Sequence, residues 1–387
     1  MFGIKVEQLE LMDALKKVKS TVGKGKDANN PFDKYVYMQV QEDAKCKPIL
    51  KLTTTNLNEI SEVECELISA SSIGEVCSLL EFTVLYNLIA TIDSSTEIEI
   101  IDSEPGKCVT VNYAGRKKPI TLAAPKSSNF VYSNPNDKYD TVISLQCGDF
   151  KDCIDRASTV IVDNEAYPIY NCVHISIKNG QVIVKALDVT MSKRMLLFSK
   201  MIAHKGEGEF FIECSKAKKL IAGMDLTQNI KIGINNNTIS LEQRDVKYFI
   251  RLVTGTFPAI EQFMPNQYKV EAVINKEEAL AALKRVKVMS DSGKGIKTCV
   301  FSINNVFTNI DLNTQVGSIS EMITTSLQGQ PLEMAFSIDS FISALYSIDD
   351  SDIKMCFYAN SCTVLMPANT KGVIHRVLVQ AINTRKN

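Results

Sequence analysis

The chain has three histidines, His174, His204 and His375, available for acid–base or metal chemistry among its 387 residues. His174 stands in an alternating, strand-like segment, and the other two stand in no recognisable ligand or nucleophile motif. We therefore expect structural roles for all three, and we predict no metal site and no cofactor. An enzyme built on scattered Asp, Ser and Cys side chains is a weaker alternative, which would require a concave site with perturbed titratable groups.

Two glycine–lysine stretches, residues 23–26 and 293–295, have the composition of a phosphate-binding loop. A P-loop needs a strand, a glycine, four residues and then Gly-Lys-Ser/Thr at the start of a helix. Both stretches instead follow predicted helices. We interpret them as flexible loops, and a phosphate-facing role for them stays open.

The 11 cysteines are scattered singly, and five residues separate the closest pairs, Cys147/Cys153 and Cys356/Cys362. No Cys-x-x-Cys motif is present. The first ten residues do not resemble a targeting peptide, and no apolar run reaches the ~20 residues that span a bilayer. We therefore expect reduced core thiols in a cytoplasmic protein that does not bind membranes.

Basic side chains recur on amphipathic segments. Apolar residues at steps of three and four predict helices over residues 6–22, 148–160 and 276–288, each with one buried stripe that in the first includes Leu9. The basic residues on these helices, and on a further helix of the second repeat, are Lys16, Lys17, Lys19, Lys151, Arg156, Lys216, Lys218, Lys219, Lys284, Arg285 and Lys287.

A solvated helix face balanced by acids explains any one of these clusters. Their recurrence in three repeats favours one combined positive surface that contacts duplex phosphates without reading sequence. The formal net charge of -1, from 43 Lys and Arg against 44 Asp and Glu, excludes a globally basic DNA binder but not a local basic surface. Aromatic residues are absent from these predicted faces, which disfavours base stacking with single strands.

The chain repeats one pattern three times. Residues 81–100, 210–232 and 334–355 each read as a strand, a helix closing on an apolar residue plus Asp, a polar turn and an alternating strand. The interval of about 130 residues indicates repeated domains rather than a solenoid. Loop-like residues 124–140 and 254–269 separate them, which predicts domains over residues 1–124, 125–253 and 254–387.

Between the helices the sequence is strand-like. Asn179-Gly180 is a strong hairpin signal, and further turns are expected near residues 114–115 and 235–237. Each domain is therefore predicted to be α+β, with two helices and about eight mostly antiparallel strands.

Residues 252–265, LVTGTFPAIEQFMP, resemble the Phe-Pro linker between the second and third domains of the bacterial DNA polymerase III beta subunit family, the replicative sliding clamps. Residues 53–62, TTTNLNEISE, are similar to a first-domain strand of that family, and Ala186-Leu187-Asp188 is similar to its Ala-Thr-Asp. The resemblance extends over the whole chain in order and is mainly architectural.

This resemblance implies a head-to-tail homodimer whose six domains form a ring around double-stranded DNA, with sheets outside and helices lining the hole. The ring would catalyse nothing. It would slide on DNA of any sequence after a clamp loader places it there. It would tether the DNA polymerase III alpha subunit and other proteins that carry a clamp-binding motif. A scaffold of the same fold that binds proteins but not DNA is the alternative.

The resemblance also implies two sets of contact residues. The partner-peptide pocket would be formed by Tyr170, Leu187, Thr190, Pro258, Phe263, Leu378, Val379 and Gln380, and the dimer interface by Ile120, Leu122, Val288 and Met289. The chain departs from the family at two pocket segments. Val189-Thr190-Met191 replaces a Gly or Ser followed by His-Arg, and residues 378–381, LVQA, replace Met-Pro-x-Arg. An altered peptide preference would follow, or the chain would be a divergent clamp, either from a mobile element or a second copy.

Overall fold

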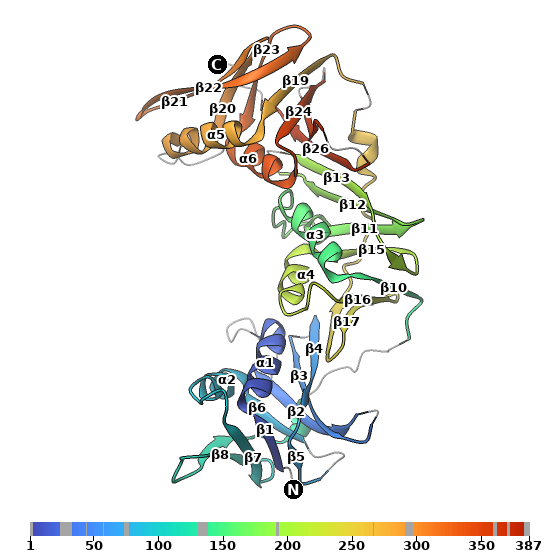
Figure 1. Ribbon diagram of the computed structural model, residues 1–387, viewed down its shortest axis with the longest axis vertical. Helices are drawn as coiled ribbons and strands as arrows, with labels where there is room; N and C mark the ends of the chain where they lie inside the picture. The colour runs from blue at the N-terminus through green and yellow to red at the C-terminus, as the bar shows by residue number, and fades with distance from the viewer. Residues whose placement is uncertain are drawn as a thin grey trace. The chain divides into compact units, whose positions relative to one another are not determined.

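The structure is a computed structural model that describes residues 3–23, 33–43, 45–56, 58–72, 77–130, 138–190, 193–265, 267–290, 297–358, 362–369 and 372–382. Most of the first glycine–lysine stretch, all of the second and Met191 lie outside the described residues. The chain divides into two compact units (Figure 1). Unit 1 contains residues 1–147 and 219–252, and unit 2 contains residues 148–218 and 253–387.

The described residues of unit 1 form two complete α-helices and two antiparallel sheets. Its main elements are β1 (Gly3–Glu7), α1 (Gln8–Val18), β2 (Tyr35–Glu42), β3 (Pro48–Thr55), β4 (Glu59–Glu66), β5 (Ser69–Ala70), β6 (Cys77–Glu81), α2 (Phe82–Ala90), β7 (Glu97–Glu104), β8 (Cys108–Tyr113), β9 (Ile120–Ala123), β10 (Thr141–Gln146), β16 (Asn229–Ile234), β17 (Thr238–Gln243) and β18 (Val246–Arg251). One sheet has the order β5-β1-β7-β8-β9. The other runs β10-β16-β17-β18-β4-β3-β2-β6, so strands from two distant segments join at the β18–β4 pair.

Unit 2 is built on one antiparallel sheet of 12 strands in the order β15-β11-β12-β13-β26-β25-β24-β19-β22-β21-β20-β23. Its main elements are α3 (Cys147–Ser158), β11 (Cys172–Lys178), β12 (Gln181–Asp188), β13 (Arg194–Met201), β14 (His204–Lys205), β15 (Gly208–Glu213), α4 (Cys214–Ile221), β19 (Val270–Asn275), α5 (Lys276–Ser290), β20 (Thr298–Ile303), β21 (Phe307–Thr314), β22 (Gly317–Gln328), β23 (Leu332–Ser337), α6 (Ile338–Ser347), β24 (Asp352–Phe357), β25 (Cys362–Pro367) and β26 (Ile374–Gln380). Helix α3 begins, and α4 ends, on residues of unit 1.

The element order confirms the predicted threefold repeat of an α+β pattern. In each repeat a strand leads directly into a helix, a group of strands follows, and a strand–helix–strand segment closes the repeat. The leading pairs are β1–α1, β10–α3 and β19–α5, and the closing segments are β6–α2–β7, β15–α4–β16 and β23–α6–β24. The proposed domain boundaries near residues 124 and 253 stay a prediction.

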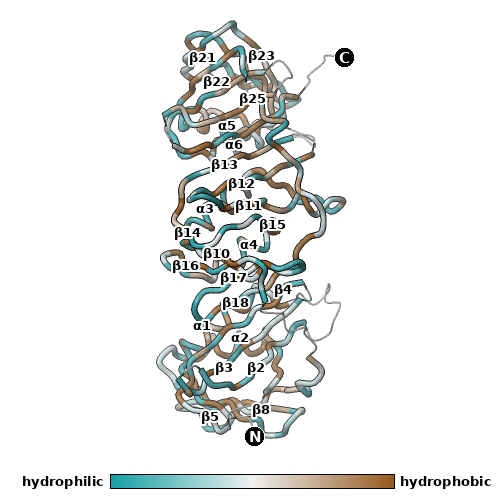
Figure 2. The backbone as a smooth tube through the Cα atoms, turned by 90° about the vertical axis from the view of Figure 1, so that its right-hand side faces the viewer, coloured by the Kyte–Doolittle hydropathy of each residue, from teal (hydrophilic) through white to brown (hydrophobic). Residues whose placement is uncertain are grey.

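Apolar stripes fix the leading helices to their sheets. On α3, Phe150 and Ile154 are fully buried, and on α5 Leu283 and Val286 are fully buried, as the spacing predicts. Helix α1 packs on β3, β4 and α2, and α5 packs on β21, β22 and α6. Figure 2 shows hydrophobic residues along the strands of both units. Each helix therefore keeps its opposite face for polar residues.

Both boundaries of the first helix, and one residue of its buried stripe, differ from the prediction. Val6 lies in β1, and the α-helix ends at Val18, after which a 3₁₀ turn, Lys19–Thr21, carries the chain on. Leu9 is 58% exposed and does not belong to the buried stripe. Steps of three and four place Leu9 on the edge of that stripe, where the strand before the helix sets the helix's rotation.

The predicted hairpin turns are confirmed. Asn179 and Gly180 join β11 to β12 with positive φ values of 52° and 75°. A two-residue turn with both φ values positive matches the right-handed twist of the strands it joins, and asparagine followed by glycine adopts it at least cost. This hairpin fixes the register of β12, which carries Leu187 and Asp188 to the end of the strand.

Candidate nucleic-acid interface

The first helix carries one exposed lysine and one paired lysine. Lys16 is exposed and forms no ion pair within the described residues. The Lys17 ammonium lies 2.7 Å from a carboxylate oxygen of Asp13 and 2.8 Å from one of Asp245. Burial lowers the pKa of Lys17, but these two carboxylates outweigh it and raise that pKa. Lys17 is thus neutralised within unit 1, whereas Lys16 is available to a phosphate.

Lys19 follows α1, and its ammonium lies 4.5 Å from the ring centroid of Tyr86 on α2, a cation–π distance. Lys219, at the end of α4, is exposed, and no ion pair to it exists among the residues that the structure describes in unit 1. Neither lysine has a carboxylate partner among the residues that the structure describes, so both ammonium groups are open to an anion.

Most cations of α3 and α4 in unit 2 face acids. Lys151 is paired with Asp155 one turn along the same helix. The Lys216 ammonium lies 2.7 Å from Glu213, and its side chain is 20% exposed. Lys218 is the most open of these, donating to Ser158 Oγ at 3.0 Å, with Asp155 3.8 Å away. Alternating charges on one helix face therefore compensate one another.

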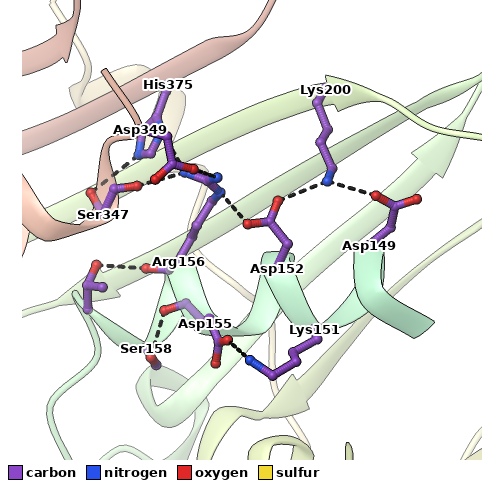
Figure 3. Close-up of polar contacts among 11 residues, drawn as sticks. Asp149, Lys151, Asp152, Asp155, Arg156, Ser158, Lys200, Ser347, Asp349 and His375 are labelled. Carbon is purple, nitrogen blue, oxygen red and sulfur yellow. Dashed lines mark hydrogen bonds and ion pairs between the residues drawn. The ribbon is translucent and has the colours of Figure 1, made fainter. Parts of the chain in front are cut away.

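Arg156 is the residue whose surroundings differ most from the prediction of a DNA-facing side chain. Its side chain is 13% exposed and is engaged on every side (Figure 3). Nε donates to Asp152 at 2.8 Å, Nη1 donates to the carbonyl oxygen of Ser347 at 2.7 Å, and Nη2 pairs with Asp349. Its guanidinium carbon also lies 4.6 Å from the ring centroid of Phe198.

The network around Arg156 extends in both directions. Lys200 on β13 donates to Asp149 and Asp152 on α3 at 2.9 Å each. Burial lowers the pKa of Lys200, yet the two carboxylates raise it overall. Lys200, Asp152, Arg156 and Asp349 thus form a row of alternating charge that joins α3 to β13 and to the turn after α6 (Figure 3). We call these four residues the α3 charge row.

Helix α5 repeats the contrast seen on α1. Lys284 is exposed, with its ammonium 5.5 Å from the ring centroid of Tyr346 on α6. The next residue, Arg285, makes two hydrogen bonds to the carboxylate of Glu321 at 2.8 and 2.6 Å. Lys287 lies 2.6 Å from Asp339. Adjacent cations on one helix therefore differ in what they can offer to a phosphate.

The structure thus divides the predicted basic residues into two groups. Seven have an aspartate or glutamate within ion-pair distance. The others have none among the described residues, and they are Lys16, Lys19, Lys219 and Lys284. Charge composition alone cannot separate the two groups, because the partners lie up to 228 residues away, as for Lys17 and Asp245.

The predicted partner pocket falls in unit 2, where β13 pairs with β26. Met195 lies opposite Leu378, and Arg194 lies opposite Val379. Because successive residues of a strand point to opposite faces, Leu378 and Val379 lie on different faces of the sheet. Leu378 is 5% exposed and packs in a cluster with Met264, so it forms part of the floor under the linker. Val379 is fully buried on the other face.

The linker covers the face that carries Leu378. Glu261, in the 3₁₀ turn Ile260–Phe263, accepts a 2.6 Å contact from Lys185 on β12. Leu187 is nearly buried, and Pro258 and Tyr170 are half-buried. Phe263 is 59% exposed, so its ring is a large apolar surface open to contact.

The loop after β12 is fixed by Asp188, whose carboxylate accepts a hydrogen bond of 2.8 Å from the backbone N–H of Thr190.

Arg194 is a residue of this region that the sequence analysis did not single out. It donates to the carbonyl oxygen of Thr159 at 2.9 Å and lies 3.3 Å from Asp188, with its side chain 7% exposed. Gln380, half-buried, donates from its backbone N–H to the carbonyl oxygen of Lys193 at 3.1 Å. An arginine soon after Ala186-Leu187-Asp188 was the signal available in the sequence.

The predicted dimer residues lie at sheet edges and on an exposed helix end. Ile120 and Leu122 are half-buried on β9, the last strand of its sheet in unit 1. In unit 2, Val288 is 72% exposed at the end of α5, and Met289 is half-buried with its Cε 3.3 Å from the position a Cβ of Gly317 would take. An unpaired strand edge and an exposed valine are both suited to burial in an assembly.

No cluster of three or more His, Cys, Asp and Glu side chains in the described ranges is arranged to hold a metal ion. None of the helices that the structure describes has the length and hydropathy of a membrane span.

The histidines and cysteines have structural surroundings. His174 lies 2.6 Å from Glu209, and His375 contacts Arg156 and Ser347. Burial raises the pKa of several thiols, including that of Cys153 to about 12, which makes them poor nucleophiles.

The fold defined by these elements is that of a DNA polymerase sliding clamp. The solved clamp from Bacillus subtilis superposes with a TM-score of 0.87 at 16% identity, covering 99% of this chain and all of that one. The DNA polymerase III beta subunit of Thermotoga maritima gives 0.84 at 17% identity, with both chains covered in full.

Sequence comparison finds similarity to the same class of protein. Residues 261–380 match the model of the DNA polymerase III beta subunit, C-terminal domain. The beta sliding clamp of Staphylococcus epidermidis is 21% identical over 296 residues, which are 73% of this chain and 77% of that protein. The beta sliding clamp of Staphylococcus aureus is 20% identical over 295 residues. The predicted resemblance to the DNA polymerase III beta subunit is confirmed.

Proposed function

We propose that this protein is a sliding clamp, a non-catalytic ring that encircles double-stranded DNA and tethers the replicative polymerase to it. The observation that carries the proposal is the agreement of the fold with solved clamps over essentially the whole chain. The named relatives that it resembles in sequence are beta sliding clamps as well. The scaffold alternative shares this fold but has no use for exposed lysines on the helices.

The DNA-facing surface is assigned to the lysines without a carboxylate partner. Lys16, Lys19, Lys219 and Lys284 can each release counterions on meeting a phosphate, whereas a paired cation must first give up its acid. Their contacts are non-specific, because an ammonium on a flexible stem binds a phosphate as a point charge. The remaining basic residues are assigned a supporting role in holding the helices.

Self-association, polymerase docking and loading complete the proposal. A ring requires two copies, with β9 of one chain meeting the third repeat of the other near Val288 and Met289. The polymerase III alpha subunit and other proteins with clamp-binding motifs would dock on the linker side of the β13–β26 pair, near Phe263. A clamp loader would open the ring, and in bacteria this work belongs to the cytoplasm. Three domains with boundaries near residues 124 and 253 give the six-domain ring.

Retention on circular DNA tests the function. Protein is mixed with nicked circular plasmid and clamp loader, passed over a gel-filtration column in high salt, and compared with the same plasmid made linear. A sliding clamp stays with the circle and leaves the linear molecule by its ends. The scaffold alternative predicts equal and low retention on both.

A further inference from the structure

Asp102 occupies a position in unit 1 where the sheet pattern calls for an apolar residue. Along β7, Ile98 and Ile100 point inward and are fully buried, while Glu97 points outward. The alternation places Asp102 on the inward face, and it is 8% exposed. A carboxylate is therefore held where a third aliphatic side chain would stabilise the sheet.

A β-bulge accompanies this aspartate. The β7–β8 ladder is regular up to the Ile101–Thr110 pair and resumes at Glu104–Cys108. Asp102 and Ser103 thus lie opposite the single residue Val109. Bulges of this kind alter the direction of a side chain and occur often beside binding sites.

Among the described residues, the Asp102 carboxylate has no hydrogen-bond or ion-pair partner for its buried oxygen. Its Oδ1 is buried without a hydrogen bond, and no cation of the described chain forms an ion pair with it. Burial raises the pKa of Asp102 and outweighs the positive charge of the chain's N-terminus, which acts to lower it. Leaving a buried carboxylate without a donor is costly, because neither water nor protein replaces its hydration.

A cavity of about 310 Å³ opens beside this carboxylate. Its wall includes the hydroxyl-bearing residues Ser78, Ser127 and Ser128, together with the turn at Pro105 and Gly106. Gly106 has a φ of +76°, and the Lys126 side chain lies against it, so a Cβ at this position would collide with the lysine stem. The cavity lining therefore combines the Asp102 carboxylate and the Lys126 side chain with several neutral hydroxyl acceptors.

We propose that the Asp102 cavity binds the ammonium group of a small aliphatic amine. A primary ammonium carries three N–H donors. The carboxylate accepts one of them and neutralises the charge, and serine hydroxyls accept the others. The volume is at the small end of ligand sites, which suits a short amine rather than a nucleotide. The proposal stands apart from the clamp function, since it uses no lysine of the helices and no residue of the partner pocket.

The test uses the full chain and two cations of different donor capacity. Thermal unfolding is followed with increasing 1,4-diaminobutane, and in parallel with tetramethylammonium chloride at equal ionic strength. Tetramethylammonium has the charge but no N–H donor. We expect diaminobutane alone to raise the melting temperature of the native chain, since a ligand that binds only the folded state stabilises it. Isothermal calorimetry should give one site per chain.

Two variants decide the assignment. Asp102→Asn keeps the shape and should lose the shift caused by diaminobutane, whereas Lys126→Met should keep it, because removing a nearby positive charge does not weaken the site. An equal shift in Asp102→Asn, or none in the native chain, would overturn the proposal. The proposal would also be overturned if, without ligand, Lys126→Met and Asp102→Asn lowered the melting temperature equally, since Lys126 would then be the partner of Asp102.

Discussion

Arg156 of α3 and Asp349 of the turn after α6 form an ion pair although 193 residues separate them in the chain. Asp349 closes the apolar-Asp pattern of the third repeat, and Arg156 lies near the end of the leading helix of the second. The pair is one end of the α3 charge row, so it couples helix α3 to the turn after α6. The stability predictions for Arg156 and His375 depend on this arrangement.

Replacing Arg156 should destabilise unit 2. Arg156→Ala leaves the buried Ser347 carbonyl without its side-chain donor, and an uncompensated buried polar group typically costs about 1–3 kcal/mol; Asp152 loses one donor but keeps Lys200. Asp349→Asn should cost less than ~1 kcal/mol, because the Asp349 side chain is 73% exposed. Urea unfolding of both variants measures the difference. If Arg156→Ala and the native chain had equal free energies of unfolding, the α3 charge row would make no net contribution to stability.

His375 should make the stability of the protein depend on pH. Arg156 can only donate, so Nδ1 of His375 accepts from it, and the ring proton is on Nε2, 3.3 Å from Ser347 Oγ. Burial, and then the charge of Arg156, lower the pKa of His375 from 6.5 to about 3. The folded ring is therefore neutral while the unfolded ring gains a proton below pH 6.5. The unfolded state binds more protons in this window, so stability falls as the pH falls.

The slope of this loss approaches ~1.4 kcal/mol per pH unit for one group. The contribution of His375 is isolated by denaturant unfolding of the native chain and of His375→Gln at several pH values between about 3 and 6.5. The Gln amide keeps an acceptor for Arg156 and a donor for Ser347 but does not titrate. Parallel curves for the two proteins would mean that His375 is protonated in the fold, contrary to its surroundings.

Adjacent cations of α5 should affect DNA binding differently. Lys284→Met removes a charge without a carboxylate partner, and should lower the salt slope of duplex binding by about 0.9 for one lost phosphate contact. Arg285→Met is the matched control, because Glu321 already neutralises Arg285. Affinity is measured against salt concentration by fluorescence anisotropy. Equal slopes for the two variants would contradict the division of the basic residues.

Phe263 should be the accessible anchor for a partner peptide. Phe263→Ala removes an exposed ring, so folding is unaffected, whereas a partner's buried apolar contact would lose about 1.5–3 kcal/mol. Leu378→Ser is unsuitable as a first test, because Leu378 is packed in the cluster with Met264 and its loss destabilises the fold. Calorimetry with a C-terminal polymerase peptide gives the affinity. Unchanged binding to Phe263→Ala moves the docking site elsewhere.

Val288 should be covered in the dimer. Val288→Lys places a charge on a side chain that is 72% exposed in the single chain, so it should leave the fold intact and weaken self-association. Val306→Lys is the control, since Val306 is 68% exposed in the same unit and lies outside the predicted interface. Sedimentation velocity at low concentration should give monomers for the first variant only. Dimers for both would contradict the placement.

Local patterns in the sequence predict the helices, turns and repeats well. The stripe through Phe150 and Ile154 and the hairpin at Asn179 and Gly180 depend on near neighbours, and both are observed. Pairings between distant segments are not visible in this way. Arg156 has the appearance of a surface cation until Asp349 is placed beside it. Strict alternation would have separated Leu378 from Val379, and a strand reading EIEIID would have marked Asp102 as an inward carboxylate.

The central claim is that the protein encircles DNA, and the direct measurement is release on cutting. Protein loaded on a nicked circular plasmid is isolated, a single-site restriction enzyme is added, and bound protein is followed with time in salt high enough to suppress simple phosphate binding. We expect stable retention before the cut and rapid loss after it. Retention that is the same before and after linearisation would contradict a topological ring.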